Sequence, residues 1–222
     1  MLKFDYHYYF FNYTTMSIEE INVKQIYDKI ANEFDNTRYR PWTCVENFLD
    51  SIPPNSNIGD IGCGNGKNML YRKDCNNYGC DFSESLVKIC LKKNLNVVIG
   101  DVLSIPYNDN TFDNTICIAV LHHLSTTEKR KKAIQELIRV TKGGGKILIL
   151  VWALEQESDS RRKFIKQENM VDWKDKKGNL LGKRYYYVFK KNELESLIDD
   201  NIKIEKSFYE RGNWGLILKK EI

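Results

Sequence analysis

Residues 58–68 contain the stretch whose residue types and spacing are best suited to bind a ligand. Gly62, Gly64 and Gly66 follow Asp60 and are separated from one another by single residues. Glycine lets the backbone take a positive φ and come close to a bound molecule. We expect a helix to begin near residue 67 and to add free N–H groups and a positive dipole end. The spacing differs from the Gly-x-Gly-x-x-Gly of dinucleotide sites. The alternative is a strand-to-helix turn that binds nothing.

Three acidic residues lie at or just after the ends of predicted strands. Asp60 ends a strand at 57–61, Asp81 follows one at 77–80, and Asp101 follows one at 96–99. Open α/β sheets bind their ligands at the carboxyl ends of the strands. An acid about twenty residues after the glycine turn, as Asp81 is, can bind both hydroxyls of a ribose. A single acid in a polar loop means little, but three in this register favour a binding site.

Two adjacent histidines, His122 and His123, follow the predicted strand at 112–118. An imidazole there can orient an acceptor or take a proton. Because side chains of neighbouring residues diverge, we expect only one of the two to face the acceptor. The alternative is a structural role, either capping the next helix or filling the wall of the cleft.

A loop after the first predicted helix combines cations with aromatic rings. It contains Arg38, Tyr39, Arg40 and Trp42, and Pro41 biases Arg40 away from helical geometry. The planar fork of arginine suits a carboxylate or a phosphate. Tyr39 and Trp42 can stack on a splayed base, as proteins that read single-stranded RNA loops do. The alternative for Trp42 is packing against the core.

The segment 160–191 is strongly basic. It contains eleven Lys or Arg and three Asp or Glu, a net charge of +8, whereas the rest of the chain carries −4. Arg161, Arg162 and Arg184 are the candidate phosphate contacts within it. A charge run can also be an ordinary solvated surface, so the segment favours RNA over a small substrate without deciding the question.

The elements that must position these groups alternate along the chain. Strands alternating with helices indicate right-handed βαβ units and a parallel sheet with helices on both faces. The last two strands are joined by a short link, which indicates an antiparallel pair. Gly143 to Gly145 should turn the chain into the strongest strand. The expected helices are 19–34, 43–49, 67–72, 83–93, 126–140 and 191–199, and the expected strands are 57–61, 77–80, 96–99, 112–118, 146–152, 202–208 and 214–219.

Length and composition agree with a single α/β domain. The 222 residues are 42% hydrophobic and 29% charged, which is typical of a globular protein. We expect one domain over 17–222 with a basic insertion at about 155–190, preceded by an extended or disordered leader at 1–16. Six cysteines without a Cys-x-x-Cys pair or a zinc-ligand spacing indicate reduced thiols and no metal site. We therefore expect an intracellular protein of the cytoplasm or the nucleus.

Seven blocks of this sequence together resemble one family, the tRNA methyltransferases that esterify 5-carboxymethyluridine at the wobble position. The glycine motif is shared by all class I methyltransferases that use S-adenosylmethionine, whereas the Arg-Tyr-x-Pro-Trp, His-His and Trp-Ala-Leu-Glu-Gln blocks are much narrower. The resemblance runs from about residue 23 to the end of the chain. The blocks are Thr37 to Trp42, Asp60 to Lys67, Ile118 to Thr126, Trp152 to Gln156, Ser160 to Arg162, Arg184 to Tyr186 and Tyr209 to Trp214.

The resemblance implies a Rossmann-like class I fold, with a mostly parallel seven-stranded sheet, and S-adenosylmethionine as cofactor. Asp60 would meet the ammonium group of the cofactor, Asp81 its ribose, and Asp101 with Val102 the edge of its adenine. The chain has Gly212 where an aspartate is expected, and its basic segment is shorter than in the family. The small zinc-binding activator of the family would cover an apolar edge formed by residues 96–99, 103–105 and the helix 83–93.

The implied reaction makes the methyl ester 5-methoxycarbonylmethyluridine in the anticodon loop of tRNA. A carboxylate, with a pKa near ~4, is already ionised at pH 7 and needs no base. The enzyme must position it in line with the methyl group and exclude water. Arg38 would hold the carboxylate, with His122 and His123 beside it. The remaining substrate contacts implied are Tyr39, Trp42, Trp152, Arg161, Arg162, Arg184, Arg211 and Asn213.

Two other functions remain open from the sequence. One is a methyltransferase acting on a small molecule or a lipid, and the other is a catalytically idle subunit with the same fold. Methyltransferases acting on base amines carry an acid or amide, two prolines and an aromatic after the fourth strand, and Ile118 to Leu124 contains none of these. The basic segment favours RNA, and the intact glycine motif with its three acids argues against an idle subunit.

Overall fold

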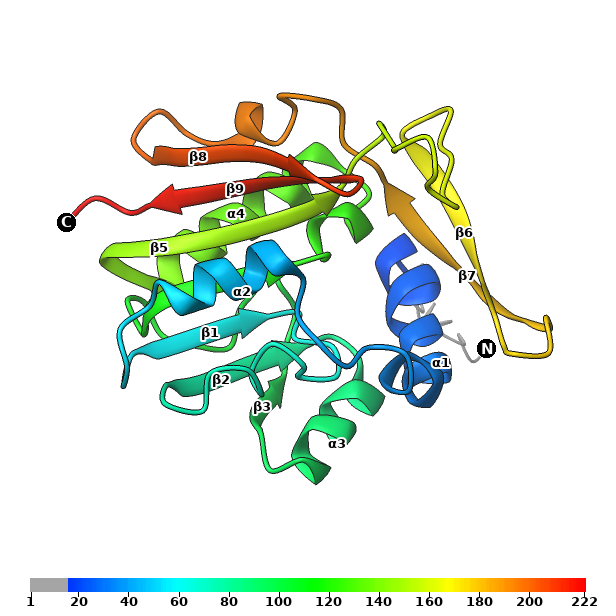
Figure 1. Cartoon of the computed structure of the whole chain (residues 1–222), viewed down its shortest axis with the longest axis horizontal. Helices are drawn as coiled ribbons and strands as arrows, with labels where there is room; N and C mark the ends of the chain where they lie inside the picture. Colours follow the sequence, from blue (N-terminus) through cyan, green and yellow to red (C-terminus); the bar gives the residue numbers. More distant parts are fainter. Residues whose placement is uncertain (1–15) are drawn as a thin grey trace, which may run out of the picture.

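Seven strands form one sheet in the order β3-β2-β1-β4-β5-β9-β8 (Figure 1). The computed structural model describes residues 16–222, so the expected leader lies outside the described residues except for Met16. The expected class I fold is confirmed, because β1 to β5 run parallel and β9 pairs antiparallel with both β5 and β8. The strands are β1 (Asn57–Ile61), β2 (Asn76–Asp81), β3 (Asn96–Ile99), β4 (Phe112–Ile118), β5 (Thr141–Trp152), β8 (Lys203–Glu210) and β9 (Asn213–Lys219).

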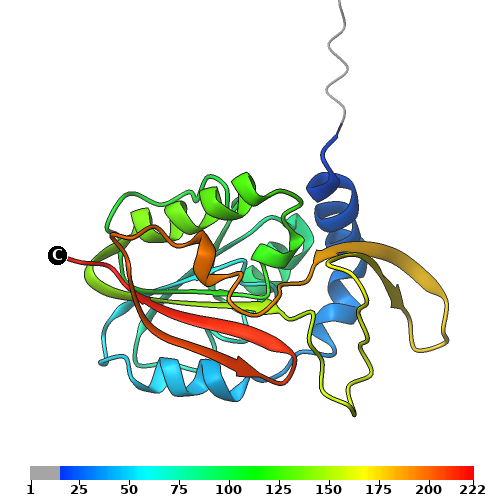
Figure 2. The same cartoon turned by 90° about the horizontal axis from the view of Figure 1, so that it is seen from above.

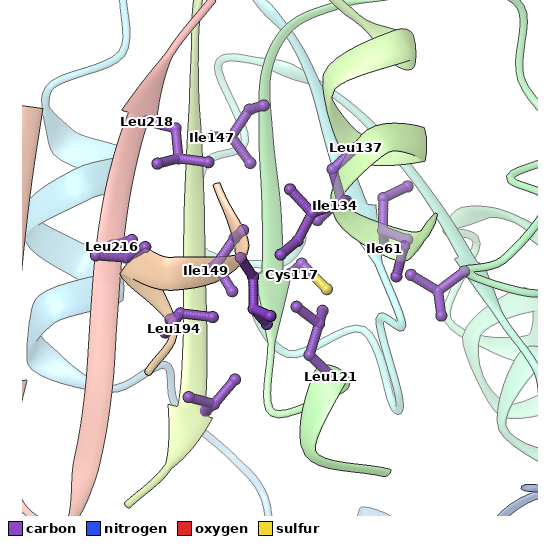
Figure 3. Packing of buried hydrophobic residues seen from close by; sticks show 14 of the residues in the cluster. Ile61, Cys117, Leu121, Ile134, Leu137, Ile147, Ile149, Leu194, Leu216 and Leu218 are labelled. Atoms are coloured by element: carbon purple, nitrogen blue, oxygen red, sulfur yellow. The ribbon is translucent and has the colours of Figure 1, made fainter. Parts of the chain in front are cut away.

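Two apolar layers cover the two faces of this sheet. On one face, α4 (Thr127–Val140) packs Ile134 and Leu137 against Cys117 and Ile149 (Figure 3). On the other face, α2 (Thr43–Asp50) packs Val45, Phe48 and Leu49 against Ile58 and Leu148. Figure 2 shows the two helices on opposite sides of the sheet. β5 is buried on both faces, which explains the continuous apolar run that made it the strongest predicted strand.

The first helical segment lies across the carboxyl ends of the parallel strands (Figures 1 and 2). It consists of a π-helical turn, η1 (Glu20–Lys24), and α1 (Gln25–Asp35), and it contacts α3 (Glu84–Lys92). A capping box begins it: Glu20 N donates to Ser17 Oγ at 3.1 Å, and Ser17 N donates to Glu20 Oε2 at 2.7 Å. No helix within residues 16–222 is long and apolar enough to cross a membrane.

Three expected elements are wrong or misplaced. Residues 67–72 form turns, not a helix, so no helix dipole stands behind the glycines. Instead, the carbonyls of Leu49 in α2 and of Ile52 just after it accept hydrogen bonds from Arg72 and connect this segment to the end of α2. The helix expected at 191–199 is only the 3-10 turn η3 (Glu195–Leu197), because Asn192 takes a φ of 63° that no helix accommodates.

The strand expected to start at residue 146 begins at Thr141, and the glycines lie inside it. Gly145 approaches β4 so closely that a Cβ there would lie 2.5 Å from Asp113 O, and the register between β4 and β5 shifts at this point. The triple glycine therefore forms an irregular strand start and not a separate turn.

A β-hairpin within the basic segment was not expected from the sequence. It consists of β6 (Glu168–Lys174) and β7 (Leu180–Tyr187), which pair antiparallel and extend away from the sheet beside α1 (Figure 1). The turn between them contains Gly178 at a φ of 88°. The inward face of β6 is half-buried at Asn169, Val171 and Trp173, and the residues between them are exposed.

Candidate active site

One cavity lies at the carboxyl ends of β1, β2 and β4, beneath α1. Its floor is formed by the turns after these strands, and its roof by α1, the following loop and β7. The residues named from the sequence that line it are Arg38, Trp42, Gly62, Gly64, Asp81, Asp101, Val102, His122, His123, Trp152 and Arg184. The structure therefore brings together eleven of the expected residues, drawn from seven separate segments of the chain.

The glycine turn forms a backbone cradle on the floor of this cavity. Gly62 and Gly64 have φ angles of 75° and 57°, and a Cβ at Gly62 would collide with Val120. Gly64 N donates to Asp81 Oδ2 at 2.8 Å, and Ser83 N donates to Asp81 Oδ1 at 2.9 Å. Burial raises the pKa of Asp81 to about 6 even though these N–H groups lower it. Each carboxylate oxygen keeps a lone pair for a ligand hydroxyl.

Asp60 lies beneath this cradle and does not itself line the cavity. Its expected contact with an ammonium group stays a prediction. It is 1% exposed, and burial raises its pKa to about 7. Asn68 lies between Asp60 and the cavity wall and donates to Asp60 Oδ2 at 3.4 Å. Within residues 16–222, Asp60 Oδ1 and Asn68 Oδ1 have no hydrogen-bond donor. Unpaired buried acceptors at this point fit a cationic ligand group such as the ammonium of S-adenosylmethionine.

Asp101 and Val102 lie on the cavity wall as expected, whereas Gly66 does not. Asp101 Oδ1 accepts from Leu103 N at 2.9 Å, and burial raises its pKa. Gly66 has a φ of 75°, and a Cβ there would collide with Leu95. Gly66 therefore serves the packing of the turn against α3, and only Gly62 and Gly64 approach a ligand.

Both histidines are buried, at 1% and 6% exposure, and both line the cavity. The expectation that only one of them faces the acceptor stays a prediction. The 3-10 turn η2 (Leu121–His123) bends the chain so that the two rings lie 4.6 Å apart. Trp152 N donates to His122 Nδ1 at 3.0 Å, and His123 Nδ1 donates to Tyr185 O at 2.7 Å. Burial lowers the pKa of His123 to about 3 and that of His122 far below its usual value. Both rings are therefore neutral, and neither is suited to take a proton at pH 7.

A column of stacked groups forms one side of the cavity. Tyr186 stacks on Trp152 with ring centroids 4.2 Å apart, and His122 stacks on the same tyrosine at 4.8 Å. The Arg162 guanidinium lies 4.2 Å from the centre of the Trp152 ring. Trp152 thus belongs to the cavity wall, Arg162 packs on its ring without lining the cavity, and Arg161 is exposed.

The Arg38 loop divides between the cavity and the surface. Arg38 and Trp42 line the cavity, and Arg38 lies over the rings of Phe34 and Trp173 at 5.3 and 5.8 Å. Tyr39 does not line the cavity and is 81% exposed. Asn65 in the glycine turn donates to Arg38 O at 2.8 Å and holds this loop over the cradle.

Arg211 lies in the turn between β8 and β9, Asn213 is the first residue of β9, and neither lines the cavity. Asn213 is buried, and its Nδ2 donates to Glu210 O and Arg211 O, both at 3.0 Å. This asparagine therefore stabilises the turn and is not available to RNA. A Cβ at Gly212 would collide with Gln156, whose amide donates to Gly212 O at 3.1 Å. Gly212, which stands where an aspartate was expected, therefore allows a close contact with Gln156.

Several residues of the cavity were not expected from the sequence, among them the polar residues Tyr27, Asn68 and Tyr186. Tyr27 Oη lies 3.1 Å from His123 Nε2, and Tyr186 Oη lies 2.8 Å from Arg184 Nη1. The run of three tyrosines at 185–187, next to Arg184, was a signal that could have pointed to Tyr186. Nothing in the spacing of Tyr27 separates it from an ordinary apolar position of the helix.

The chain is similar to known proteins over most of its length. A family model described as "Methyltransferase domain" matches residues 59–149. A tRNA (carboxymethyluridine(34)-5-O)-methyltransferase of Schizosaccharomyces pombe is 41% identical, and the match covers 92% of this chain and 100% of that protein. Proteins of the same name from Xenopus tropicalis and Arabidopsis thaliana are 35% and 49% identical, over 92% and 66% of this chain. The matched part spans 41% and 36% of those two longer proteins.

Solved structures share the fold at low sequence identity. The CcbJ methyltransferase of Streptomyces caelestis is 11% identical, with a TM-score of 0.71 over 89% of this chain and 98% of that one. A chain from the complex of the Haloferax volcanii Trm112 methyltransferase activator with a putative methyltransferase is 14% identical. Its TM-score is 0.65, over 90% of this chain and 98% of that one.

Proposed function

Because the chain belongs to the tRNA (carboxymethyluridine(34)-5-O)-methyltransferase family, we propose that it methylates the carboxylate of 5-carboxymethyluridine at the wobble position of tRNA. The methyl donor is S-adenosylmethionine. The observation that supports the proposal most is that one cavity has an acidic half and a basic half. Asp81 and Asp101 lie at the glycine cradle, whereas the opposite wall presents Arg38 and Arg184 among aromatic rings.

The acidic half of the cavity fits the cofactor. Asp81 presents two carboxylate oxygens for ribose hydroxyls, and Asp101 with Val102 offers a carboxylate and a backbone N–H for the adenine edge. The unpaired Asp60 and Asn68 oxygens suit the ammonium group. When bound, S-adenosylmethionine supplies an electrophilic methyl group on a sulfonium centre. The residues of the chain bind it, orient it and keep water away.

The basic half of the cavity fits an anionic acceptor that needs no base. A carboxylate is ionised at neutral pH, so transfer of a methyl group to it releases no proton. The neutral His122 and His123 agree with this chemistry, because a buried ring with a strongly lowered pKa cannot act as a base. The protein contributes orientation and exclusion of water, with α1 as the roof over the acceptor.

Nucleoside mass spectrometry tests this proposal. The protein is incubated with S-adenosylmethionine and with tRNA that carries 5-carboxymethyluridine at position 34. We expect 5-methoxycarbonylmethyluridine to appear with wild-type protein and to fall strongly with Asp81→Ala. A product methylated on a base nitrogen or on a ribose hydroxyl would contradict the substrate assignment and leave the cofactor assignment intact.

We further propose that a small zinc-binding activator protein covers the β3 edge of the sheet. β3 is the terminal strand, and Ile99 and Val98 on it are 54% and 40% exposed, as is Leu91 on α3 at 53%. An exposed apolar edge strand favours association. The expected surface needs correction in two places, because Ile105 is buried in the core and Leu86, Val87 and Cys90 of α3 point inward.

Expression alone and with the activator tests the partner proposal. We expect the single chain to aggregate or to lose most of its activity, and co-expression to restore a soluble heterodimer. Val98→Lys with Ile99→Lys should make the chain more soluble alone and abolish assembly. A monodisperse single chain with full activity would contradict a requirement for the partner.

We also propose that the protein works in the cytoplasm or the nucleus. All six cysteines are free thiols, and four of them are buried, as expected for a reducing compartment. Imaging of a fluorescent fusion would check the compartment directly.

A further inference from the structure

Arg184 is a buried cation without an acidic partner. It projects from β7 to the cavity wall and is 6% exposed. Its Nη1 donates to Tyr186 Oη at 2.8 Å and to Tyr27 Oη at 3.3 Å, and its Nε has no acceptor within the described part of the chain. Among the salt bridges of residues 16–222, none joins Arg184 to an Asp or Glu, whereas Asp35, Glu19 and Glu136 each pair with a Lys or Arg.

Aromatic rings surround this guanidinium in place of a counter-ion. Its carbon lies 4.7, 5.1 and 5.7 Å from the ring centres of Trp173, Tyr186 and Tyr27. Cation–π contacts compensate part of the desolvation of the charge, but they leave its net charge unneutralised. The positive charge of Arg184 also contributes to keeping His122 and His123 neutral. A buried cation that opens into a cavity without a partner favours the binding of an anion.

Hydrogen-bond counting shows which hydroxyl is free to help. His123 Nδ1 carries the proton, because it donates to a carbonyl, so the neutral ring has an acceptor at Nε2. Tyr27 must therefore donate its proton to His123 Nε2. Tyr186 Oη accepts from Arg184, and its own proton has only the long 3.4 Å contact to Tyr27 Oη. One guanidinium and one hydroxyl proton therefore remain available to a ligand at this point.

We propose that Arg184 and the Tyr186 hydroxyl bind the carboxylate of the acceptor nucleoside, a refinement that rests on the proposed function. From the sequence we expected Arg38 in this role and Arg184 among the RNA contacts. Arg38 is half-exposed, whereas Arg184 is buried, and Arg38 lies farther from the Trp173 ring, at 5.8 Å against 4.7 Å. Tyr27 and His123 act as positioning residues. His123 Nδ1 donates to the carbonyl of Tyr185, next to Tyr186, and Tyr27 Oη lies beside Tyr186 Oη. Neither of them touches the carboxylate.

This arrangement accounts for selection of the substrate and release of the product. A carboxylate oxygen forms a bond to the methyl carbon, the carbon–sulfur bond of the cofactor breaks, and its electron pair stays on sulfur. The acceptor changes from an anion to a neutral ester, and the uncharged product loses its Coulomb attraction to Arg184. An amide in place of the carboxylate would lack the same attraction, so the site should discriminate against 5-carbamoylmethyluridine.

Binding of two matched anticodon stem–loops tests the proposal without relying on turnover. One carries 5-carboxymethyluridine and the other 5-carbamoylmethyluridine, and both are titrated into protein saturated with S-adenosylhomocysteine. We expect wild type to prefer the acid at least tenfold. Arg184→Gln should remove this preference, with unchanged affinity for the amide stem–loop and for S-adenosylmethionine. Tyr186→Phe, which keeps the stacked ring, should lower the preference several-fold and stands in if Arg184→Gln does not fold.

Arg38→Gln serves as the matched comparison, because it removes the other cavity arginine. The proposal is overturned if Arg184→Gln keeps the preference for the acid, or if Arg38→Gln loses it instead. A wild-type protein that methylates another position and shows no preference for the acid would contradict the proposed function itself. A wild-type protein that forms the ester while Arg184→Gln retains acid selectivity would contradict only this refinement.

Discussion

His122 and His123 show how neighbouring residues of one type acquire separate tasks from their partners. A backbone N–H fixes His122 with its proton on Nε2, and a carbonyl fixes His123 with its proton on Nδ1. Burial keeps both rings neutral. Their contribution is therefore shape and hydrogen bonding, and the general-base role considered from the sequence does not fit the structure.

Asp81 gives a testable pH dependence of cofactor binding. Its pKa is raised to about 6 in the unliganded protein, and only the ionised form offers both oxygens to ribose hydroxyls. Affinity for S-adenosylmethionine should therefore fall as pH drops through 6, by about tenfold between pH 7 and pH 5 from this group alone. Calorimetry at several pH values measures this.

Asp81→Asn provides the control for that titration. Asp81→Asn should bind S-adenosylmethionine more weakly at pH 7, by about 1–3 kcal/mol. Between pH 7 and pH 5, its affinity should lack the fall of about tenfold that Asp81 causes in wild type. A variant with the full wild-type pH dependence would show that Asp81 is not the group that titrates.

The first helical element depends on a few buried polar contacts for its position over the cavity. Glu19 accepts from Ser125 N at 2.8 Å and pairs with Lys129 Nζ at 2.6 Å. Asp28 accepts from Ser83 Oγ and Ser85 N in the first turn of α3. These contacts connect η1 and α1 to the segments that carry the histidines and Asp81, so the roof and floor of the cavity are linked directly.

Glu19 predicts an acid-sensitive attachment of this element. Burial alone would raise the pKa of Glu19, but the hydrogen bonds from Lys129 and Ser125 together outweigh burial and lower the pKa to about 2. Because folding lowers this pKa, ionised Glu19 stabilises the folded protein fully above pH 4.5, the pKa of the side chain in the unfolded chain. This stabilisation is lost as the pH falls toward 2. Glu19→Gln should therefore destabilise the protein by about 2–3 kcal/mol at pH 5 and by clearly less at pH 3. Urea unfolding at the two pH values measures the difference.

Glu33→Gln on the exposed face of α1 is the matched control, and it should change stability little at either pH. If Glu19→Gln destabilises equally at pH 5 and pH 3, the ion pair with Lys129 is not the source of the effect.

The sequence predicted the elements whose signals are local and failed where tertiary contacts decide. β1, β2 and β4 were correctly placed because apolar runs end in acids or turns. The helix at 67–72 was wrong because hydrogen bonds from Arg72 to the end of α2 outweigh a single helical turn, whose nucleation is unfavourable. The β6–β7 hairpin was missed because its charged outer face hid the alternation of Asn169, Val171 and Trp173.

For the candidate site, too, local features could be predicted from the sequence and features that depend on tertiary contacts could not. Glycines and strand-end acids could be named from spacing alone, since topology brings strand ends together. The depth of Asp60 behind Asn68, the inward position of both histidines and the isolation of Arg184 depend on packing between distant segments. Spacing therefore gave no sign of them.

At the scale of the whole molecule, the basic charge is concentrated beside the cavity entrance. The β6–β7 hairpin carries exposed Lys174, Lys176, Lys177 and Lys183, and it extends outward next to α1 (Figure 2). This arrangement suits a polyanion that lies along the hairpin while a single nucleotide enters the cavity.

Removing two hairpin charges should weaken tRNA binding and its dependence on salt. Lys176→Ala with Lys177→Ala should reduce the slope of log affinity against log salt by about 0.7 to 0.9 for each lost phosphate contact. Lys203→Ala with Lys206→Ala on β8 removes the same charge from the other end of the molecule and should leave the slope nearly unchanged. Equal effects of the two pairs would contradict a localised RNA surface.

The proposed function depends most on the chemical form of the transferred methyl group. The most direct measurement is mild alkaline treatment of tRNA after reaction with S-adenosylmethionine labelled in its methyl group. We expect alkali to release the label as methanol and to regenerate 5-carboxymethyluridine at position 34, because only an ester hydrolyses in this way. Label that survives alkali on a base nitrogen, a base carbon or a ribose oxygen would contradict the proposed function.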